Sequence, residues 1–244
     1  MVVKPSELAP LTTLMVGKLF DEGCRVAVVA RRVELLEDLA GTIVAAGSHR
    51  PMVVQQDLLA PGAAGLVWEA VQSRWGGVDI LVNNAGGSRP ASWDATEEEW
   101  AAGTTLNFEV ARQLAVRCLP AMRAQQWGRI INITGINEPA RVNIATVAKA
   151  ALHSWSKGLS REVAKDGITV NCVPPGRINT EQILQRVHPD ARGRQELIEQ
   201  NVPIGYFGEA ADIAHVVAFL ASPLARYITG EVIHVDGGMH RAAG

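Results

Sequence analysis

Residue types that can move protons occur within the stretch Gly128–Lys149. The β-branched run Arg129–Thr134 predicts a short buried strand, and Ala145–Leu159 has the periodicity of a helix with one apolar side. Lys149 lies on this helix, and Glu138 lies in the loop before it. Glu138 is a candidate general acid or base, because proton transfer in catalysis needs a positioned group that can gain and lose a proton.

Four further motifs surround this stretch. They are Asn83-Asn84-Ala85-Gly86, Thr105-Leu106-Asn107, Pro175-Gly176 followed by Thr180, and the C-terminal run Tyr227–Met239. In this order, and together with the strand and helix around Lys149, they resemble the short-chain dehydrogenase/reductase family from Gly23 to the end of the chain. The resemblance implies a Rossmann-like α/β fold and a nicotinamide-dependent oxidoreductase.

The resemblance also assigns roles around Lys149. In the family a Tyr-x-x-x-Lys pair supplies an acid/base and a lysine that lowers the tyrosine pKa and binds the nicotinamide ribose. Lys149 matches that lysine, and Asn107 matches an asparagine that holds a proton-relay water. Ala145 stands at the tyrosine position and Gly135 at the position of a hydroxyl-bearing serine. A positioned acid/base is typically worth about 10²–10⁴ in rate, so these two replacements argue against ordinary carbonyl reduction.

Other side chains could replace the tyrosine. Glu138 is the best candidate, because it lies in the shortened loop between Gly135 and Ala145. Thr134 should point to the opposite side of its strand, since side chains alternate along a strand. His153, one turn after Lys149, is more consistent with a core or interface histidine.

The cofactor residues follow from the resemblance as well. Arg31-Arg32, after the second strand of the fold, match a pattern in which a guanidinium meets the 2′-phosphate of NADP(H), but they could simply be a solvated helix start. Asp57 matches an adenine-contacting aspartate, and a helix N-cap is the alternative. The remaining matches to cofactor-contacting positions are Asn83, Ala85, Gly86, Lys149 and Thr180. The glycine-rich phosphate loop would fall on Pro5–Thr12, where no glycine is present.

Composition narrows the class of protein. The chain has 244 residues, of which 48% are hydrophobic and 20% charged, and its net charge is −2. No basic block marks a nucleic-acid binder, and no apolar run is long enough for a membrane span. The three cysteines lack metal-ligand or CxxC spacing, so we expect reduced thiols, no metal site and a cytoplasmic location.

Strands alternating with helices predict one doubly wound parallel sheet in a three-layer α/β/α domain over residues 1–244. The expected strands are Arg25–Ala30, Pro51–Gln56, Val78–Val82, Arg129–Thr134, Ile168–Val173 and Tyr227–Val235. The expected helices are Leu14–Phe20, Val33–Ala46, Gly62–Trp75, Thr96–Met122, Ala145–Leu159 and Ala210–Ser222. Residues 1–13 diverge from the family, because the first strand is nearly lost, and we expect them to be disordered, rebuilt or covered by another subunit. Residues 177–202 should form a substrate flap.

Two functional hypotheses follow. The first is an NADP(H)-linked oxidoreductase acting on a small carbonyl or alcohol with a nonstandard proton donor. The alternative is a protein of the same fold without nicotinamide-dependent redox chemistry, either a lyase, isomerase or cyclase or an inactive binding subunit. The family resemblance further implies a homodimer or homotetramer.

Overall fold

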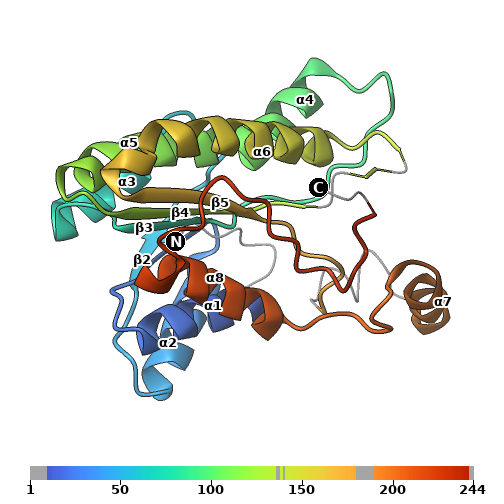
Figure 1. Ribbon diagram of the computed structural model, residues 1–244, viewed down its shortest axis with the longest axis horizontal. Helices are drawn as coiled ribbons and strands as arrows, with labels where there is room; N and C mark the ends of the chain where they lie inside the picture. The colour runs from blue at the N-terminus through green and yellow to red at the C-terminus, as the bar shows by residue number, and fades with distance from the viewer. Residues whose placement is uncertain (1–9, 136–137, 140, 180–189, 242–244) are drawn as a thin grey trace.

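The computed structural model describes residues 10–135, 138–139, 141–179 and 190–241, with the side chains of residues 10–13 left aside. Its strands lie in one layer between two layers of helices (Figure 1). The strands are β1 (Ala27–Ala30), β2 (Met52–Gln55), β3 (Ile80–Asn83), β4 (Gly128–Ile133) and β5 (Ile168–Val173). The helices are α1 (Pro10–Asp21), α2 (Val33–Ala45), α3 (Ala63–Trp75), α4 (Glu97–Thr104), α5 (Val110–Ala124), α6 (Ile144–Val163), α7 (Ala191–Asn201) and α8 (Ala210–Ala221).

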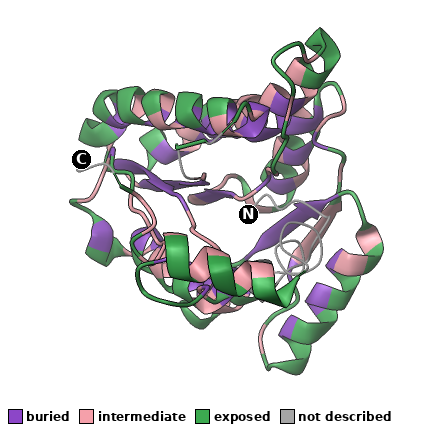
Figure 2. Cartoon of the chain, turned by 90° about the vertical axis from the view of Figure 1, so that its right-hand side faces the viewer, coloured by how far each residue is buried: buried purple, intermediate pink, exposed green. Residues whose placement is uncertain are grey.

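The strands are apolar on both faces, because each face packs against helices. Val28 belongs to the core shared with α1, α2 and α8, while its neighbour Val29 belongs to the core shared with α3 and α5. The same division separates Ile131 from Ile130 on β4. Figure 2 shows these buried strands between helices whose outer surfaces are exposed. The predicted Rossmann-like α/β fold is confirmed.

Every strand pair among the described residues is parallel. β1 pairs with β2, and β4 pairs with β3 on one side and with β5 on the other. The described residues therefore form a two-stranded and a three-stranded sheet. The expectation for residues 1–13 can be followed only from Pro10, where α1 begins, because residues 1–9 lie outside the described residues.

The prediction of a continuous strand over Tyr227–Val235 is corrected by the structure, which has no named strand there. This segment makes only isolated parallel bridges to β5 and the residues after it, at Cys172↔Val232 and Pro175↔Val235. The physical reason is that Pro174 has no amide proton to donate, so the ladder is interrupted there and resumes only where the amide of Val235 donates to the carbonyl of Pro174 and that of Gly176 to the carbonyl of Val235.

The helices begin and end close to the predicted residues, with two differences. α1 begins at Pro10 rather than Leu14, which fits the preference of proline for the first turn of a helix. The expected single helix Thr96–Met122 is two α-helices joined by the π-helical segment Thr105–Glu109. The amide of Val110 there donates to the carbonyl of Thr105, five residues back, so one extra residue is accommodated in the turn. Of the expected flap, residues 177–202, the structure describes 177–179 and 190–202, which include α7, and residues 180–189 lie outside the described residues.

Candidate functional site

Lys149 is placed by α6 against the carboxyl ends of β3 and β4. Its Nζ donates to the carbonyl oxygen of Ile133 at 2.7 Å and lies 3.4 Å from that of Ala85. The side chain is buried, with the residue 7% exposed. Two backbone carbonyls at adjacent strand ends therefore fix where this ammonium group lies, and the ligand-binding or catalytic role of Lys149 stays a prediction.

Asn107 lies inside the π-helical segment and reaches the same place. Its Nδ2 donates to the carbonyl of Gly103 at 2.9 Å, and its Oδ1 accepts from the amide of Gly87 at 3.0 Å. Single π turns are frequent at functional sites because they re-aim a side chain without ending the helix. Here the turn directs a buried carboxamide toward the loop after β3.

Gly86 marks the point at which Lys149 and Asn107 converge. A Cβ added at this residue would lie 2.9 Å from Asn107 Oδ1 and 2.9 Å from Lys149 Nζ. The backbone angle φ of Gly86 is not in the positive region, so the need for glycine comes from the close approach alone. The polar ends of both side chains therefore border one small space beside Gly86.

Ala145 and Gly135 border this region without polar side-chain atoms. Ala145 is buried in the first turn of α6, where its amide donates to the Asn143 carboxamide at 3.0 Å. A Cβ added at Gly135 would meet no atom of the described residues within 4 Å. Neither side chain can donate or accept a proton here.

A Thr134–His153 pair lies farther along α6 and was missed by the sequence reasoning. His153 Nε2 lies 2.7 Å from Thr134 Oγ1. Burial, followed by the positive charges of His234 and Lys149, lowers the pKa of His153 to about 4, so its ring is neutral near pH 7. Eight residues separate His153 from Ala145, about 12 Å along a helix axis, so the pair does not take the position of the family tyrosine. No local sequence signal predicts this contact, because its two residues meet only in the folded chain.

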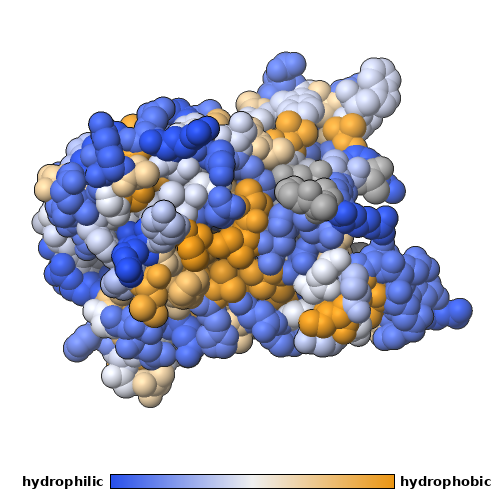
Figure 3. Space-filling view, in the orientation of Figure 1, coloured by the Kyte–Doolittle hydropathy of each residue, from blue (hydrophilic) through white to orange (hydrophobic). Residues whose placement is uncertain are grey.

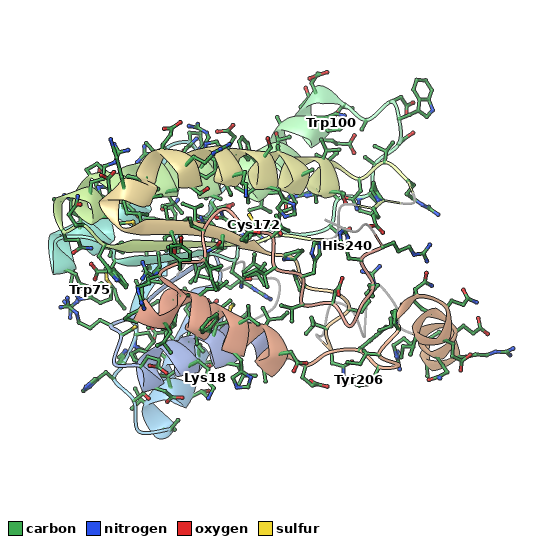
Figure 4. All side chains as sticks on the ribbon, viewed as in Figure 1. Lys18, Trp75, Trp100, Cys172, Tyr206 and His240 are labelled. Atoms are coloured by element: carbon green, nitrogen blue, oxygen red, sulfur yellow. The ribbon has the colours of Figure 1, made fainter. Side chains whose placement is uncertain are left out.

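Glu138 lies beside the C-terminal residues. Its Oε1 is 3.1 Å from His240 Nδ1 and accepts from the amide of Arg241 at 3.1 Å. The His240 ring stacks on His234 with centroids 3.8 Å apart. Burial lowers the pKa of His234. Figure 4 shows His240 near the end of the molecule to which β5 runs. These contacts attach the loop after β4 to the C-terminus, and the catalytic role of Glu138 stays a prediction.

The proposed adenine end of the site is at the carboxyl ends of β1 and β2. Arg31 and Arg32 are exposed after β1, and Arg32 is the N-cap residue of α2 without a side-chain cap. Asp57 is exposed after β2 and accepts from the amide of Leu59 at 3.0 Å. The N-cap alternative for Asp57 is wrong, because the N-cap residue of α3 is Gly62.

Asn83 lies at the end of β3 in a buried chain of amides. Its Nδ2 donates to Asn132 Oδ1 at 2.8 Å, and Asn132 Nδ2 donates to Ser156 Oγ at 2.9 Å. This chain joins β3, β4 and α6. Ala85, next to Gly86, is buried and contributes the carbonyl near Lys149. Thr180 lies outside the described residues.

The described residues fit a nicotinamide dinucleotide. Because Gly86 has no Cβ, the polar ends of Asn107 and Lys149 can both approach the backbone at the carboxyl edge, where open α/β sheets bind ligands. Exposed guanidinium groups lie on the same edge, at Arg31 and Arg32. Within the described residues, no group of three or more histidine, cysteine or acidic residues is arranged to hold a metal ion. In the same part of the chain, no helix is long and apolar enough to cross a membrane.

Comparison with known proteins places the chain in a family. Residues 13–240 match the family model described as Enoyl-(Acyl carrier protein) reductase. The chain is 40% identical over 185 residues to the 3-oxoacyl-[acyl-carrier-protein] reductase FabG of Vibrio cholerae, covering 74% of each chain. It is 32% identical over 227 residues to the FabG of Aquifex aeolicus, covering 91% of this chain and 90% of the relative.

Solved structures agree over nearly the whole chain. L-sorbose reductase from Gluconobacter frateurii, complexed with NADPH and L-sorbose, superposes with a TM-score of 0.90 at 32% identity, covering 99% of this chain and 96% of the other. YwfH, an NADPH-dependent reductase involved in bacilysin biosynthesis, superposes with a TM-score of 0.91 at 26% identity, covering 99% and 98%. The chain belongs to the short-chain dehydrogenase/reductase family of oxidoreductases.

Proposed function

We propose that this protein is an NADP(H)-linked oxidoreductase that acts on a small carbonyl or alcohol substrate. The observation that carries the proposal is the convergence of Lys149 Nζ and Asn107 Oδ1 on Gly86 at the carboxyl edge of the sheet. The solved relatives described as NADPH-dependent or complexed with NADPH support the choice of cofactor. Arg31 and Arg32 support it independently, because guanidinium groups bind phosphate in a bidentate way.

The chain's own residues would position the cofactor and supply a proton. When bound, the reduced nicotinamide would provide a hydride to the carbonyl carbon. Lys149 would hold the ribose and keep a proton at Nζ, while the Asn107 carboxamide would hold a water beside it. Because Ala145 and Gly135 have no proton to give, the proton for the substrate oxygen would come from Lys149 Nζ, directly or through that water.

The test begins with titration of the purified protein with NADPH and NADH, read by fluorescence and calorimetry. We expect binding that favours NADPH at least tenfold, and Arg31→Ala and Arg32→Ala should weaken NADPH without weakening NADH. Reduction would then be assayed with ketose and 3-oxoacyl substrates, the classes named for the relatives. Absence of binding for both cofactors at millimolar concentration would refute the proposal.

Two variants separate the possible proton donors. Lys149→Met should abolish turnover, whereas Lys165→Met, at an exposed lysine just after the same helix, should leave it unchanged. Glu138→Gln tests the remaining sequence-based candidate. A loss of kcat in Glu138→Gln with unchanged NADPH affinity would make Glu138 the acid/base in place of Lys149.

The alternative of a fold without redox chemistry rests on the glycine-free stretch Pro5–Thr12 together with Ala145 and Gly135. It predicts that NADPH neither binds nor is oxidised, while the protein still binds another small molecule in a way that depends on Lys149. The cofactor titration therefore distinguishes the two hypotheses directly.

We also propose that the protein forms a homo-oligomer through the face carrying its C-terminal segment. Apolar side chains gather in the middle of that face (Figure 3). Tyr227 is 98% exposed and Leu224 is 76% exposed in the single chain, and Phe219 of α8 is also exposed. Sedimentation equilibrium should give a dimer or tetramer, and Tyr227→Asp should shift it toward monomer. A monomeric wild-type protein at high concentration would contradict this.

A further inference from the structure

Arg177 is a half-buried cation that follows β5 and begins the expected substrate flap. Its Nε atom is buried and has no hydrogen-bond partner within the described residues. No carboxylate of the same residues forms an ion pair with it. Burial lowers the pKa of the guanidinium, which nevertheless stays charged near pH 7 because its ordinary pKa is far higher. A charge that is withdrawn from water without a partner costs free energy, so this position calls for a ligand.

The acidic residues on the two segments beside Arg177 are bound to other groups. A Cβ added at the preceding residue would lie 2.6 Å from the Cα of Asp236, so the C-terminal segment is in close contact there. The Asp236 carboxylate accepts two amides of its own segment, at 2.9 and 2.8 Å. On the other side, the carboxylate of Glu209 accepts from the carboxamide of Asn179. Neither carboxylate therefore neutralises the guanidinium.

The backbone around Arg177 sets the direction of its side chain. The Arg177 carbonyl accepts from the amide of Gly208 at 2.9 Å, and the amide of Asn179 donates to the carbonyl of Gly208 at 2.8 Å. These bonds form a parallel bridge centred on Ile178, whose side chain is buried in the core that contains α8. Because side chains alternate along an extended chain, that of Arg177 leaves the backbone on the side opposite this core.

Arg177 and Lys149 lie at the same end of the sheet. The last residues of β4 and β5, Ile133 and Val173, are paired in the parallel register. Lys149 Nζ donates to the carbonyl of Ile133, and Arg177 comes four residues after Val173, about 13 Å along an extended chain. This carboxyl edge is where open α/β sheets bind ligands. A substrate whose charged end lies several bonds from its carbonyl is long enough to contact both residues.

We propose that Arg177 binds an anionic group of the substrate, a carboxylate or a phosphate, at the carboxyl end of β5. The inference rests on the proposed oxidoreductase function and names its substrate class, a carbonyl or alcohol compound with a negative charge several bonds from the reacting carbon. The planar guanidinium presents parallel N–H donors that match two oxygens of such a group. The anion supplies the partner that the described residues lack. A phosphate of the cofactor is the other source of the same chemistry, and the experiments separate the two.

The first experiment measures stability without any ligand. Arg177→Met should raise the melting temperature by roughly 2–5 °C, because methionine fills a similar volume without an uncompensated charge. Arg161→Met, at an exposed arginine of α6, is the matched control and should change it little. An arginine that braces the fold would give the reverse result. A melting temperature of Arg177→Met at or below that of the control would therefore overturn the proposal.

The second experiment compares anions with their neutral counterparts in NADPH-dependent reduction at constant ionic strength. The probes are 4-oxopentanoate, 5-oxohexanoate and 6-oxoheptanoate with their methyl esters, and dihydroxyacetone phosphate with dihydroxyacetone. The wild-type protein should prefer at least one anion to its partner. Arg177→Met should raise the KM for that anion about 10- to 100-fold, the value of hydrogen bonds between charged groups, and Arg177→Lys should raise it less. The KM for the neutral partner and the affinity for NADPH should stay within about twofold. Equal losses for both partners, or a tenfold loss of NADPH affinity, would overturn the assignment to the substrate.

Calorimetric titration with the same probes in the absence of NADPH separates this inference from the proposed function. Anions that bind the wild-type protein but not Arg177→Met, with no NADPH oxidation by any probe, would support the anion site and refute the redox function. Turnover that is equally fast for anions and neutral partners would support the redox function and overturn the role of Arg177.

Discussion

Gly86→Ala tests whether the two polar side chains of the candidate site share one space. The added Cβ would approach Asn107 Oδ1 and Lys149 Nζ to 2.9 Å each, closer than a carbon normally lies to either atom. Lys149 has to retreat from the carbonyl of Ile133, to which it donates at 2.7 Å, or Asn107 has to leave the amide of Gly87. Both responses break a contact that positions a polar group in a buried site.

The cost can be worked from these contacts. A hydrogen bond that involves a charged group contributes about 1.5–3 kcal/mol, and overpacking a filled site costs about 1–3 kcal/mol. Because the side chains can shift and so reduce both costs in part, we expect Gly86→Ala to lower the free energy of unfolding by about 2–4 kcal/mol. For a chain of this size that corresponds to a fall of roughly 5–12 °C in melting temperature. NADPH affinity should fall at least tenfold, since Lys149 no longer holds its position.

Gly135→Ala is the matched control. It is also a loop glycine beside the site, neither residue has a positive φ, and a Cβ at Gly135 meets no atom within 4 Å. Calorimetric melting and NADPH titration of both variants provide the assay. If Gly86→Ala melts and binds NADPH like Gly135→Ala, the convergence of Lys149 and Asn107 on Gly86 does not exist in solution and the proposed site loses its main support.

Two further predictions concern titrating groups. His153 has a pKa near 4 in the folded chain and the ordinary value of 6.5 when unfolded, so the unfolded chain binds more protons between these values. Stability from this group is complete above pH 6.5 and is lost as pH falls toward 4, by about 1–2 kcal/mol after allowing for partial exposure. His153→Asn should flatten urea-measured stability over that pH range, whereas the exposed control His215→Asn should not. Burial raises the pKa of Cys118 to about 12, so at pH 8 a thiol reagent should label the half-buried Cys24 first. Faster labelling of Cys118 would show that α5 opens readily.

Much of the fold could be predicted from local sequence patterns. β5 has the predicted bounds, because the apolar run Ile168–Val173 is closed by Pro174 and Pro175. Pro174 also explains why the strand predicted over Tyr227–Val235 is not continuous. The apolar pattern of Tyr227–Val235 predicts a strand, but it says nothing about the neighbouring segment, where Pro174 lacks an amide donor. Strand formation depends on the partner as well as on the strand itself.

The residues of the candidate site could be predicted where they belong to a family sequence motif. Lys149 and Asn107 were singled out by resemblance, and the structure brings their side chains to one glycine. The Thr134–His153 contact could not be predicted in this way, because the two residues are far apart in sequence and belong to no common motif. The π turn around Asn107 was also invisible, since an extra residue inside a helix leaves the neighbouring hydrophobic pattern intact.

That π turn makes chain length in this region matter more than residue type. Gly103 of α4 packs against Ile144 of α6, while Leu114 of α5 is buried in the core between the sheet and helices α3 and α5. One residue corresponds to about 100° of rotation around a helix axis. Deleting any single residue of Thr105–Glu109 would turn α4 and α5 relative to each other by that angle, so the two contacts could not both persist. Point substitutions in this segment leave the rotation unchanged, so positions other than the buried Leu106 and Asn107 should tolerate changes of residue but no change in the number of residues.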